Sequence, residues 1–248
     1  MFRGIGTVVN VVTVVAGAGI GVLLGNRLPD RTREVVTDAL GLVTLLVAGL
    51  NAVSVTDDRL SDKVGGSAPV LIVLGALLVG GIAGSLLRIE SRLEGFGGWL
   101  QDRLTGASGS AHRQRFIEGF VAASLLFCVG PLTILGSLSD GLGNGADQLL
   151  LKATLDGFAA IAFASSLGWG VAASALVVAV VQGGLTVVGA VAGEVLPEAE
   201  LLALTATGGL LLIGVALRLL RIRQVPVGDL LPALLVAPVL TAVVAALR

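Results

Sequence analysis

The sequence predicts an all-α polytopic membrane protein with about eight transmembrane helices and an inverted-topology internal repeat. Of the 248 residues, 55% are hydrophobic and only 13% are charged, whereas charged residues usually make up about a quarter of a soluble domain. Apolar runs long enough to cross a bilayer recur along the whole chain, and one segment returns after 168 residues. The composition excludes a disordered chain, and the net charge of −1 without a basic arm gives no support for nucleic-acid binding.

Eight apolar runs have the length that a transmembrane helix needs, which is about 20 residues at a rise of 1.5 Å each. The stretch from 157 to 193 carries no charge and is too long for one span, so we expect a turn at Gly168-Trp169-Gly170. The predicted spans are Ile5–Leu24, Val35–Val55, Val70–Leu87, Ile117–Leu138, Leu149–Leu167, Val171–Ala192, Leu201–Leu220 and Leu230–Leu247.

A short amphipathic segment separates the third and fourth spans. Its apolar residues recur at spacings of three and four, at Ile89, Leu93, Phe96, Leu100 and Leu104. This pattern predicts either a helix in the membrane interface, with Trp99 at the level of the headgroups, or an ordinary cytosolic connecting helix.

Lys and Arg residues gather on alternate loops, which predicts the orientation of the chain. Eleven of them lie in the loops after the first, third and seventh spans, and five lie on the other side. Because cytoplasmic loops carry the excess of basic residues, we expect those three loops in the cytoplasm and both termini outside it.

The repeat relates the first two spans to the sixth and seventh, and a weaker match at an offset of 163 adds the third and eighth. A displacement of five spans gives the two copies opposite orientations. The charges agree, because the loop of the first copy is basic whereas that of the second copy carries three glutamates and no base. The aligned positions include Gly21 with Gly189, Leu28-Pro29-Asp30 with Leu196-Pro197-Glu198, Gly41 with Gly209, and Pro69 with Pro232.

The two central spans resemble each other as well, since Glu118-Gly119-Phe120 matches Asp156-Gly157-Phe158 at an offset of 38. We therefore expect one membrane domain over residues 1–248. Its parts are a first repeat at 1–87, a cytoplasmic loop with the interfacial helix at 88–116, a central pair of helices at 117–170 and a second repeat at 171–248.

Gly130 and Pro131 stand near the middle of the fourth span. Proline lacks an amide proton and clashes with the preceding turn, so the Phe127 carbonyl loses its helical partner near the bilayer midplane. We expect Ser124 and Cys128 to lie beside this carbonyl, on the face of Pro131. A packed kink and a broken helix that lines a cavity both fit the sequence.

Lys152 and Asp156 are four residues apart in the fifth span, close enough to pair on a helix. Charged groups inside the hydrocarbon are costly, so this pair is a candidate binding site for a solute or ion. The alternative is that Lys152 extends to the outer surface and only neutralises Asp156. If the match with Glu118 reflects symmetry, the protein has two related carboxylates, one near each face, which suits cation or proton coupling.

Three uncharged amides, Asn10, Asn51 and Gln182, lie within predicted spans. Interhelical hydrogen bonds explain them, and they are secondary candidates for contact with a solute. One His and one Cys leave no ligand set for a structural zinc ion and no internal disulfide, so we expect no metal and no other cofactor.

Several strings together resemble one family: Gly6-Thr7-Val8-Val9-Asn10, Phe127-Cys128-Val129-Gly130-Pro131, Asp140-Gly141, Leu155-Asp156-Gly157-Phe158 and Thr205-Ala206-Thr207-Gly208-Gly209. Over nearly its whole length the chain resembles the bacterial integral membrane family known as domain of unknown function 554. The resemblance implies a bacterial inner-membrane protein of a family often described as transporter candidates. It brings no established substrate or catalytic residue.

These features favour membrane transport of a small solute or ion by a secondary transporter with a midplane site between inverted repeats. A passive channel and a non-transport membrane scaffold or regulatory protein are the alternatives. We expect no enzyme, since the single His lies in a loop and no nucleophile has a base beside it in a span. The expected partners are the lipid bilayer and the solute, with no nucleic acid, and a homo-oligomer is compatible with the sequence.

Overall fold

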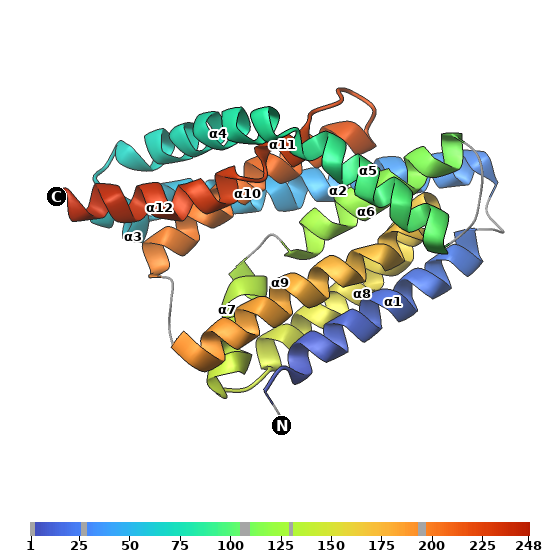
Figure 1. Cartoon of the computed structure of the whole chain (residues 1–248), viewed down its shortest axis with the longest axis horizontal. Helices are drawn as coiled ribbons and strands as arrows, with labels where there is room; N and C mark the ends of the chain where they lie inside the picture. Colours follow the sequence, from blue (N-terminus) through green and yellow to red (C-terminus); the bar gives the residue numbers. More distant parts are fainter. Residues whose placement is uncertain (1–2, 26–28, 105–109, 129–130, 193–196) are drawn as a thin grey trace. The chain divides into compact units, whose positions relative to one another are not determined.

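A computed structural model of the chain describes residues 3–25, 29–104, 110–128, 131–192 and 197–248, and over these residues it is helical with no strand (Figure 1). In chain order the helices are α1 (Ile5–Gly25), α2 (Asp30–Ala52), the 3-10 helix η1 (Val53–Thr56), α3 (Asp58–Val64), α4 (Ala68–Leu87), α5 (Ile89–Leu104), α6 (Ser110–Cys128), α7 (Pro131–Leu142), α8 (Asp147–Leu167), α9 (Gly170–Ala192), α10 (Glu198–Leu219), α11 (Val227–Leu230) and α12 (Ala233–Ala246).

The predicted spans correspond to these helices. Within the described ranges, seven segments are long and apolar enough to cross a membrane, and α6 with α7 forms an eighth candidate. The predicted turn between the fifth and sixth spans is confirmed, because Gly168 has a φ of +78° and ends α8 two residues before α9 begins. The last span starts with the short helix α11 and continues through α12.

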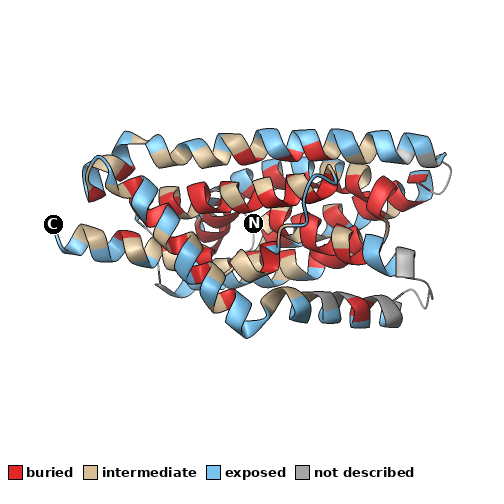
Figure 2. Cartoon of the chain, turned by 90° about the horizontal axis from the view of Figure 1, so that it is seen from above, coloured by how far each residue is buried: buried red, intermediate tan, exposed pale blue. Residues whose placement is uncertain are grey.

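The helices carry exposed residues on one side and buried residues on the other (Figure 2), and many of the exposed side chains are large and apolar. Leu86, Val191 and Leu235 are each at least 75% exposed, whereas Ala18 and Ala76 are fully buried. Soluble monomers rarely expose large contiguous apolar patches, so such faces suit a surrounding of lipid.

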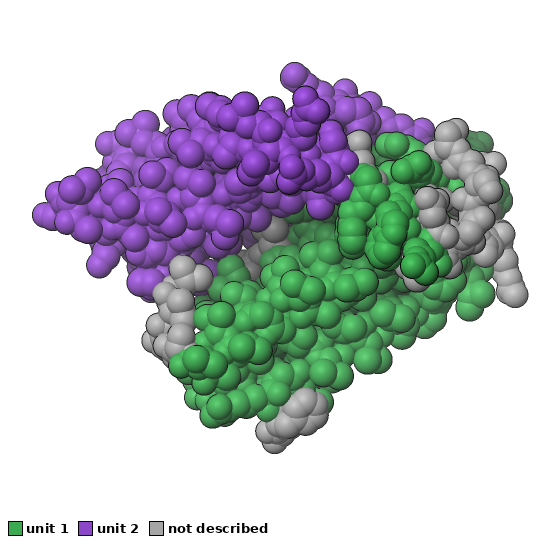
Figure 3. All heavy atoms as spheres, viewed as in Figure 1, with its two compact units in different colours: residues 1–40, 94–195 green, residues 41–93, 196–248 purple. Residues whose placement is uncertain are grey.

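The chain divides into two compact units (Figure 3). The first comprises residues 1–40 and 94–195, and the second comprises residues 41–93 and 196–248. Each unit combines early and late parts of the sequence, because α1 joins α9 in the first unit and α4 joins α10 and α12 in the second.

In the first unit α1 contacts both α8 and α9. It runs in the same direction as α8 and in the opposite direction to α9. A Cβ added at Gly17 would meet the carbonyl of Gly157, and one added at Gly25 would meet the carbonyl of Ser165. The contacts advance together along both helices, so α1 and α8 are parallel, with backbones close enough to require glycine. The hydroxyls of Thr7 and Thr186 are 3.3 Å apart, and α1 runs antiparallel to α9.

In the second unit α2 and α10 are antiparallel and also meet at glycines. A Cβ added at Gly41 would meet residues 219–220, and one added at Gly209 would meet the backbone of residues 51–52. The close approach at both points requires the absence of a side chain.

Helices α4 and α12 of the second unit pack antiparallel in the same way. A Cβ added at Gly80 would meet the backbone of Ala233, and one added at Gly75 would meet Leu240. Around this contact, buried alanines join Leu60 and Ile72 in an apolar core.

Helices α6 and α7 form one broken span, with an angle of 60° between them. The start of α6 lies beside the start of α9, since a Cβ added at Gly170 would meet the carbonyl of Phe116. The end of α7 lies beside the end of α9, since a Cβ added at Gly189 would meet the carbonyl of Leu138. The pair therefore follows α9 along most of its length, as a single crossing does and a re-entrant loop does not.

The break frees a backbone carbonyl, as predicted, and a hydroxyl of α7 satisfies it. Thr133, in the first turn of α7, donates its hydroxyl to the Phe127 carbonyl at 3.0 Å. The expected neighbour, Ser124, has a buried Oγ for which no partner is found in the described part of the chain. The 60° bend between α6 and α7 allows a hydroxyl six residues downstream to reach the carbonyl. Gly130 itself lies outside the described residues.

The amphipathic segment after α4 folds as predicted into a helix, α5. Phe96 stacks on Trp99 with ring centroids 5.8 Å apart and lies 6.0 Å from the ring of Phe120 in α6. Trp99 is 54% exposed. An exposed indole beside a packed apolar face suits a membrane interface, and its level in the membrane remains a prediction.

Candidate functional site

A buried ion pair on α8 forms the centre of the polar interior of the first unit. Lys152 Nζ donates to Asp156 Oδ2 at 2.5 Å, across one turn of the helix. Each side chain is only 9% exposed, so Lys152 neutralises Asp156 inside the unit and does not extend to the surface. A charge at the centre of a membrane helix costs about 2.5–3.5 kcal/mol on insertion scales, so each group depends on the other.

Helix α1 contributes a third group to this pair. Asn10, which is fully buried, donates its Nδ2 proton to the same Asp156 Oδ2 at 2.9 Å. The parallel packing of α1 on α8, fixed by the glycines about two to four turns further along α1, sets Asn10 at this level. An interhelical hydrogen bond thus explains Asn10, as predicted. Its Oδ1 has no hydrogen-bond partner among the described residues.

Helix α9 brings Gln182 to the same level. Thr7 meets Thr186, and because the helices are antiparallel, Asn10 and Gln182 follow one turn further on the facing sides. Gln182 is fully buried, yet neither its Nε2 nor its Oε1 has a partner within the described ranges. The predicted interhelical hydrogen bond is therefore absent for Gln182.

The remaining predicted residues lie at different distances from the ion pair. Cys128, at the end of α6, is within electrostatic range of both Lys152 and Asp156. Glu118 is far from them, because the next residue packs against Leu167, about 16 Å further along α8 at 1.5 Å per residue. Asn51 belongs to the second unit, with its backbone against Gly209, and Pro131 begins α7.

Asp140 is a buried carboxylate to which the sequence assigned no role. Its Oδ1 accepts a hydrogen bond from the Gly4 amide at 3.1 Å, and its Oδ2 accepts one from the Gly6 amide at 3.0 Å. A negative charge at the start of α1 is favourable, because the first amides of a helix have no partner inside it. The sequence signal was present, since Asp140-Gly141 is one of the family-like strings, but its partners lie more than 130 residues away.

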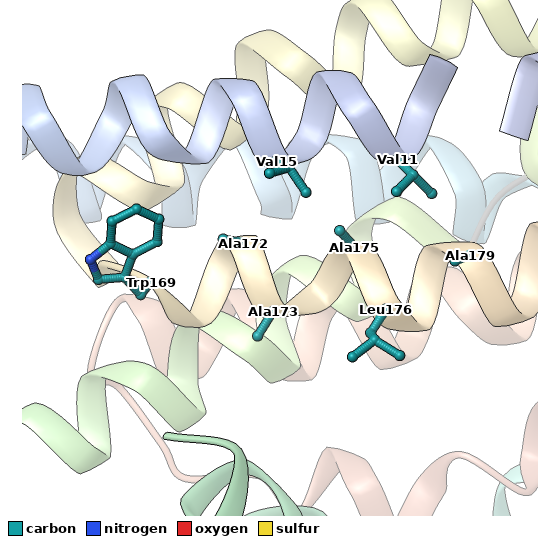
Figure 4. A pocket seen from close by; sticks show the side chains of 8 residues that line it. All are labelled: Val11, Val15, Trp169, Ala172, Ala173, Ala175, Leu176 and Ala179. Atoms are coloured by element: carbon teal, nitrogen blue, oxygen red, sulfur yellow. The ribbon is translucent and has the colours of Figure 1, made fainter. Parts of the chain in front are cut away.

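An apolar groove of about 750 Å³ lies between α1 and α9 (Figure 4). Valine, alanine and leucine side chains line it together with the indole of Trp169. The groove contains none of the predicted polar site residues, so it suits an acyl chain better than a polar solute.

A second ion pair, largely buried, lies in the second unit, where sequence reasoning placed no site. Arg218 donates to Glu90 Oε1 at 2.5 Å, and the amide of Gly228 donates to Glu90 Oε2. The amide of Glu90 in turn donates to Asp229 Oδ1 at 2.9 Å. These bonds connect α5, α10 and α11. No cluster of three or more metal-binding side chains occurs among the residues that the structure describes in either unit.

The long apolar helices and the enclosed ion pair define a helical membrane protein that spans the bilayer several times. The family described as "Protein of unknown function (DUF554)" matches residues 5–242 of the chain. The chain therefore belongs to this family, which confirms the resemblance. It is 30% identical over 239 residues to the uncharacterized membrane protein YdfK of Bacillus subtilis (strain 168), with 96% of each chain covered. It is 29% identical over 238 residues to the uncharacterized protein YqgA of Escherichia coli (strain K12), also with 96% of each chain covered. No solved structure matches the chain.

Proposed function

We propose that this protein is a secondary transporter of a small solute or ion, with its site at Lys152 and Asp156 between two inverted repeats. The observation that carries the proposal is the buried ion pair, contacted by Asn10 from another helix and accompanied by the unpartnered amide of Gln182. Ionisable residues in transmembrane helices are rare and commonly mark the path of a substrate or ion. The proposal includes no catalytic step.

Reciprocal contacts between α2 and α10 support the inverted repeat. Gly41 packs against residues 219–220, and Gly209, its partner at an offset of 168, packs against residues 51–52. A shift of 168 residues turns the contact of residue 41 with residues 219–220 into the contact of residue 209 with residues 51–52. This reciprocity is what a two-fold axis requires. The other two related pairs, α1 with α9 and α4 with α12, are antiparallel as well.

The broken span gives a second line of support. The only bond described for the Phe127 carbonyl comes from the Thr133 hydroxyl. Another donor can replace this hydroxyl at lower cost than it could replace a backbone amide within a regular helix. Transporters commonly place their sites at such discontinuous helices. The end of α6 is also where Cys128 comes within range of the ion pair.

We place the protein in the bacterial inner membrane, with both termini outside the cytoplasm. The basic residues of the loops support this orientation, which puts the start of α5 and the Arg218 end of α10 on the cytoplasmic side.

The proposal can be tested by flux in proteoliposomes that contain a trapped pH indicator, with a panel of inorganic ions, amino acids and organic acids as solutes. Asp156→Asn alone leaves Lys152 buried and unpaired, so it is combined with Lys152→Met. We expect wild-type protein to couple one of these gradients to internal pH and the double variant to lose the coupling completely. Asp147→Asn, an exposed carboxylate in the first turn of α8, is the matched control and retains wild-type flux.

Three results would contradict secondary transport at this site. Wild-type flux in the double variant removes Asp156 from the mechanism. Solute flux that never moves a proton or a second ion indicates a passive channel. Absence of flux over the whole panel, with correctly inserted protein, favours the scaffold alternative.

A further inference from the structure

Three polar atoms at the level of the buried ion pair of α8 have no hydrogen-bond partner in the described part of the first unit. They are Asn10 Oδ1 on α1 and the Oε1 and Nε2 atoms of Gln182 on α9, and both residues are fully buried. A buried polar group without a partner is costly, and native structures contain few of them. Three such atoms at the level of a buried ion pair therefore indicate a ligand rather than packing alone.

The bond from Asn10 to Asp156 fixes which atom of the Asn10 amide is left over. A carboxylate in an ion pair can only accept, so Asn10 must turn its Nδ2 protons toward Asp156 Oδ2, which lies at 2.9 Å. Asn10 Oδ1 is then an acceptor without a donor. Gln182 offers one acceptor and one donor group whichever way its amide is turned. The described atoms of the site thus provide two spare acceptors and one spare donor group.

The charges of the site favour a ligand that carries no net charge. Lys152 and Asp156 balance each other, and each side chain is only 9% exposed. A cation bound at Asp156 would leave Lys152 without a counter-charge, and an anion bound at Lys152 would leave Asp156 without one. An uncompensated charge inside a membrane is costly, so the site favours neither of these ligands.

A zwitterion meets this condition and also uses the spare atoms. Its ammonium carries three donors and no acceptor, which suits Asp156 Oδ2, Asn10 Oδ1 and Gln182 Oε1. Its carboxylate only accepts, which suits Lys152 Nζ and Gln182 Nε2. An uncharged polar molecule could bond to the two amides, but it would make no use of the ion pair.

The spacing and burial of the site limit the size of the zwitterion. Lys152 and Asp156 are four residues apart on α8, a rise of about 6 Å, so the charged groups of the ligand must also lie close together. The side chains of both residues, and those of Asn10 and Gln182, are at least nine-tenths buried, which does not suit a bulky substituent. A small α-amino acid, whose ammonium and carboxylate are attached to one carbon, meets both conditions.

We propose that a small α-amino acid binds between Lys152 and Asp156 by exchanging partners with the ion pair. Its ammonium takes the place of Lys152 at Asp156, and its carboxylate bonds to the released Lys152 ammonium. The amides of Asn10 and Gln182 complete the hydrogen bonds of the ligand. One ion pair becomes two, and no net charge enters the unit. This inference rests on the proposed transport function and names the class of its substrate.

The test measures binding to purified protein in detergent, independently of flux. Melting temperature and titration calorimetry are followed with glycine, L-alanine and L-serine, with the amide and the N-acetyl derivative of each, and with glycine betaine. The amides lack the carboxylate, the N-acetyl derivatives lack the ammonium, and betaine keeps both charges but has no N–H donor. We expect saturable binding of at least one amino acid, and affinity at least about tenfold weaker for its two derivatives and for betaine.

Variants of the chain separate this site from nonspecific effects. Gln182→Leu removes an unpartnered amide, so we expect it to melt at or above the wild-type temperature without ligand and to bind the amino acid at least about tenfold more weakly. Gln148→Leu, at an exposed glutamine in the first turn of α8, is the matched control and should bind like wild type. Lys152→Met combined with Asp156→Asn should abolish binding.

The contrary outcomes are distinct. Equal binding of an amino acid and its amide or N-acetyl derivative, or wild-type affinity in Gln182→Leu, would overturn the inference. Absence of binding by all three amino acids would also overturn it, and flux of an inorganic ion or an organic acid would then leave the proposed transport function standing. Amino-acid binding without any flux would support the site and reject transport.

Discussion

Two buried ion pairs, Lys152 with Asp156 in the first unit and Arg218 with Glu90 in the second, differ in how completely the polar groups around them are hydrogen-bonded. Glu90 uses both carboxylate oxygens, one for Arg218 and one for the Gly228 amide, and its own amide reaches Asp229. Asp156 receives Lys152 and Asn10 on a single oxygen, and unpartnered amide atoms accompany it in the described structure.

The difference shows how buried charge can serve two purposes in one chain. A fully bonded network fixes the elements that it connects, because moving any one of them leaves a charge without compensation. A pair with spare acceptors beside it can exchange one partner for a ligand without losing all its bonds. We therefore interpret the Glu90 pair as a structural clamp and the Asp156 pair as a binding site.

The largest stability effect is expected from the clamp. Glu90→Ala leaves the Gly228 amide without its acceptor and the Arg218 guanidinium with the Val225 carbonyl at 3.4 Å in place of a carboxylate, and removal of one partner from a buried pair costs about 3–5 kcal/mol. Thermal unfolding in detergent should show a large drop in melting temperature, with a smaller drop for Glu90→Gln. Arg92→Ala, an exposed change on the same helix, is the control and should leave stability nearly unchanged. If Glu90→Ala and Arg92→Ala had the same melting temperature, the Glu90 pair would not be a structural clamp.

The clamp could not have been predicted from the sequence, whereas the Asp156 pair could. Lys152 and Asp156 are one helical turn apart, so helix geometry alone brings them together. Glu90 and Gly228 are separated by 138 residues, and only the folded chain brings them together. The same distinction applies at the Phe127 carbonyl. Pro131 alone predicts that this carbonyl loses its helical partner, whereas the new bond from Thr133 depends on the direction of the bend.

The ends of the helices show a related limit of hydropathy. The second predicted span begins at Val35, but α2 begins at Asp30, since polar residues continue the helix beyond the apolar run. Hydropathy marks the part of a helix that suits lipid, and it does not mark where helical hydrogen bonding stops.

A third ion pair, on the surface of the second unit, should have the smallest effect. Arg59 contacts Asp57 and Glu198 and is 59% exposed, and its side-chain and backbone hydrogen bonds lower the pKa of Asp57 to about 2. A lowered carboxylate pKa stabilises the fold above the ordinary value near 4, and this contribution is lost only as the pH falls toward 2. Across pH 5–9 the contribution is therefore constant and screened by solvent.

The variant Asp57→Asn tests this expectation. Asparagine caps a helix about as well as aspartate, so the Arg59 amide can donate to the asparagine side chain as it donates to Asp57 in wild type. We expect the melting temperatures of Asp57→Asn and wild type to agree within error from pH 5 to pH 9. A drop in melting temperature as large as that of Glu90→Ala would show that the exposure of an ion pair does not determine how much it stabilises this protein.

The most direct test of the central claim exchanges the two charges of the site, with Lys152→Asp and Asp156→Lys in one variant. An ion pair at the same spacing is kept, so the protein should insert and melt near the wild-type temperature, but the carboxylate moves one turn away from Asn10. Flux in proteoliposomes should then be lost completely. Wild-type flux in this variant would contradict the account, because it would show that the pair contributes only its charge balance.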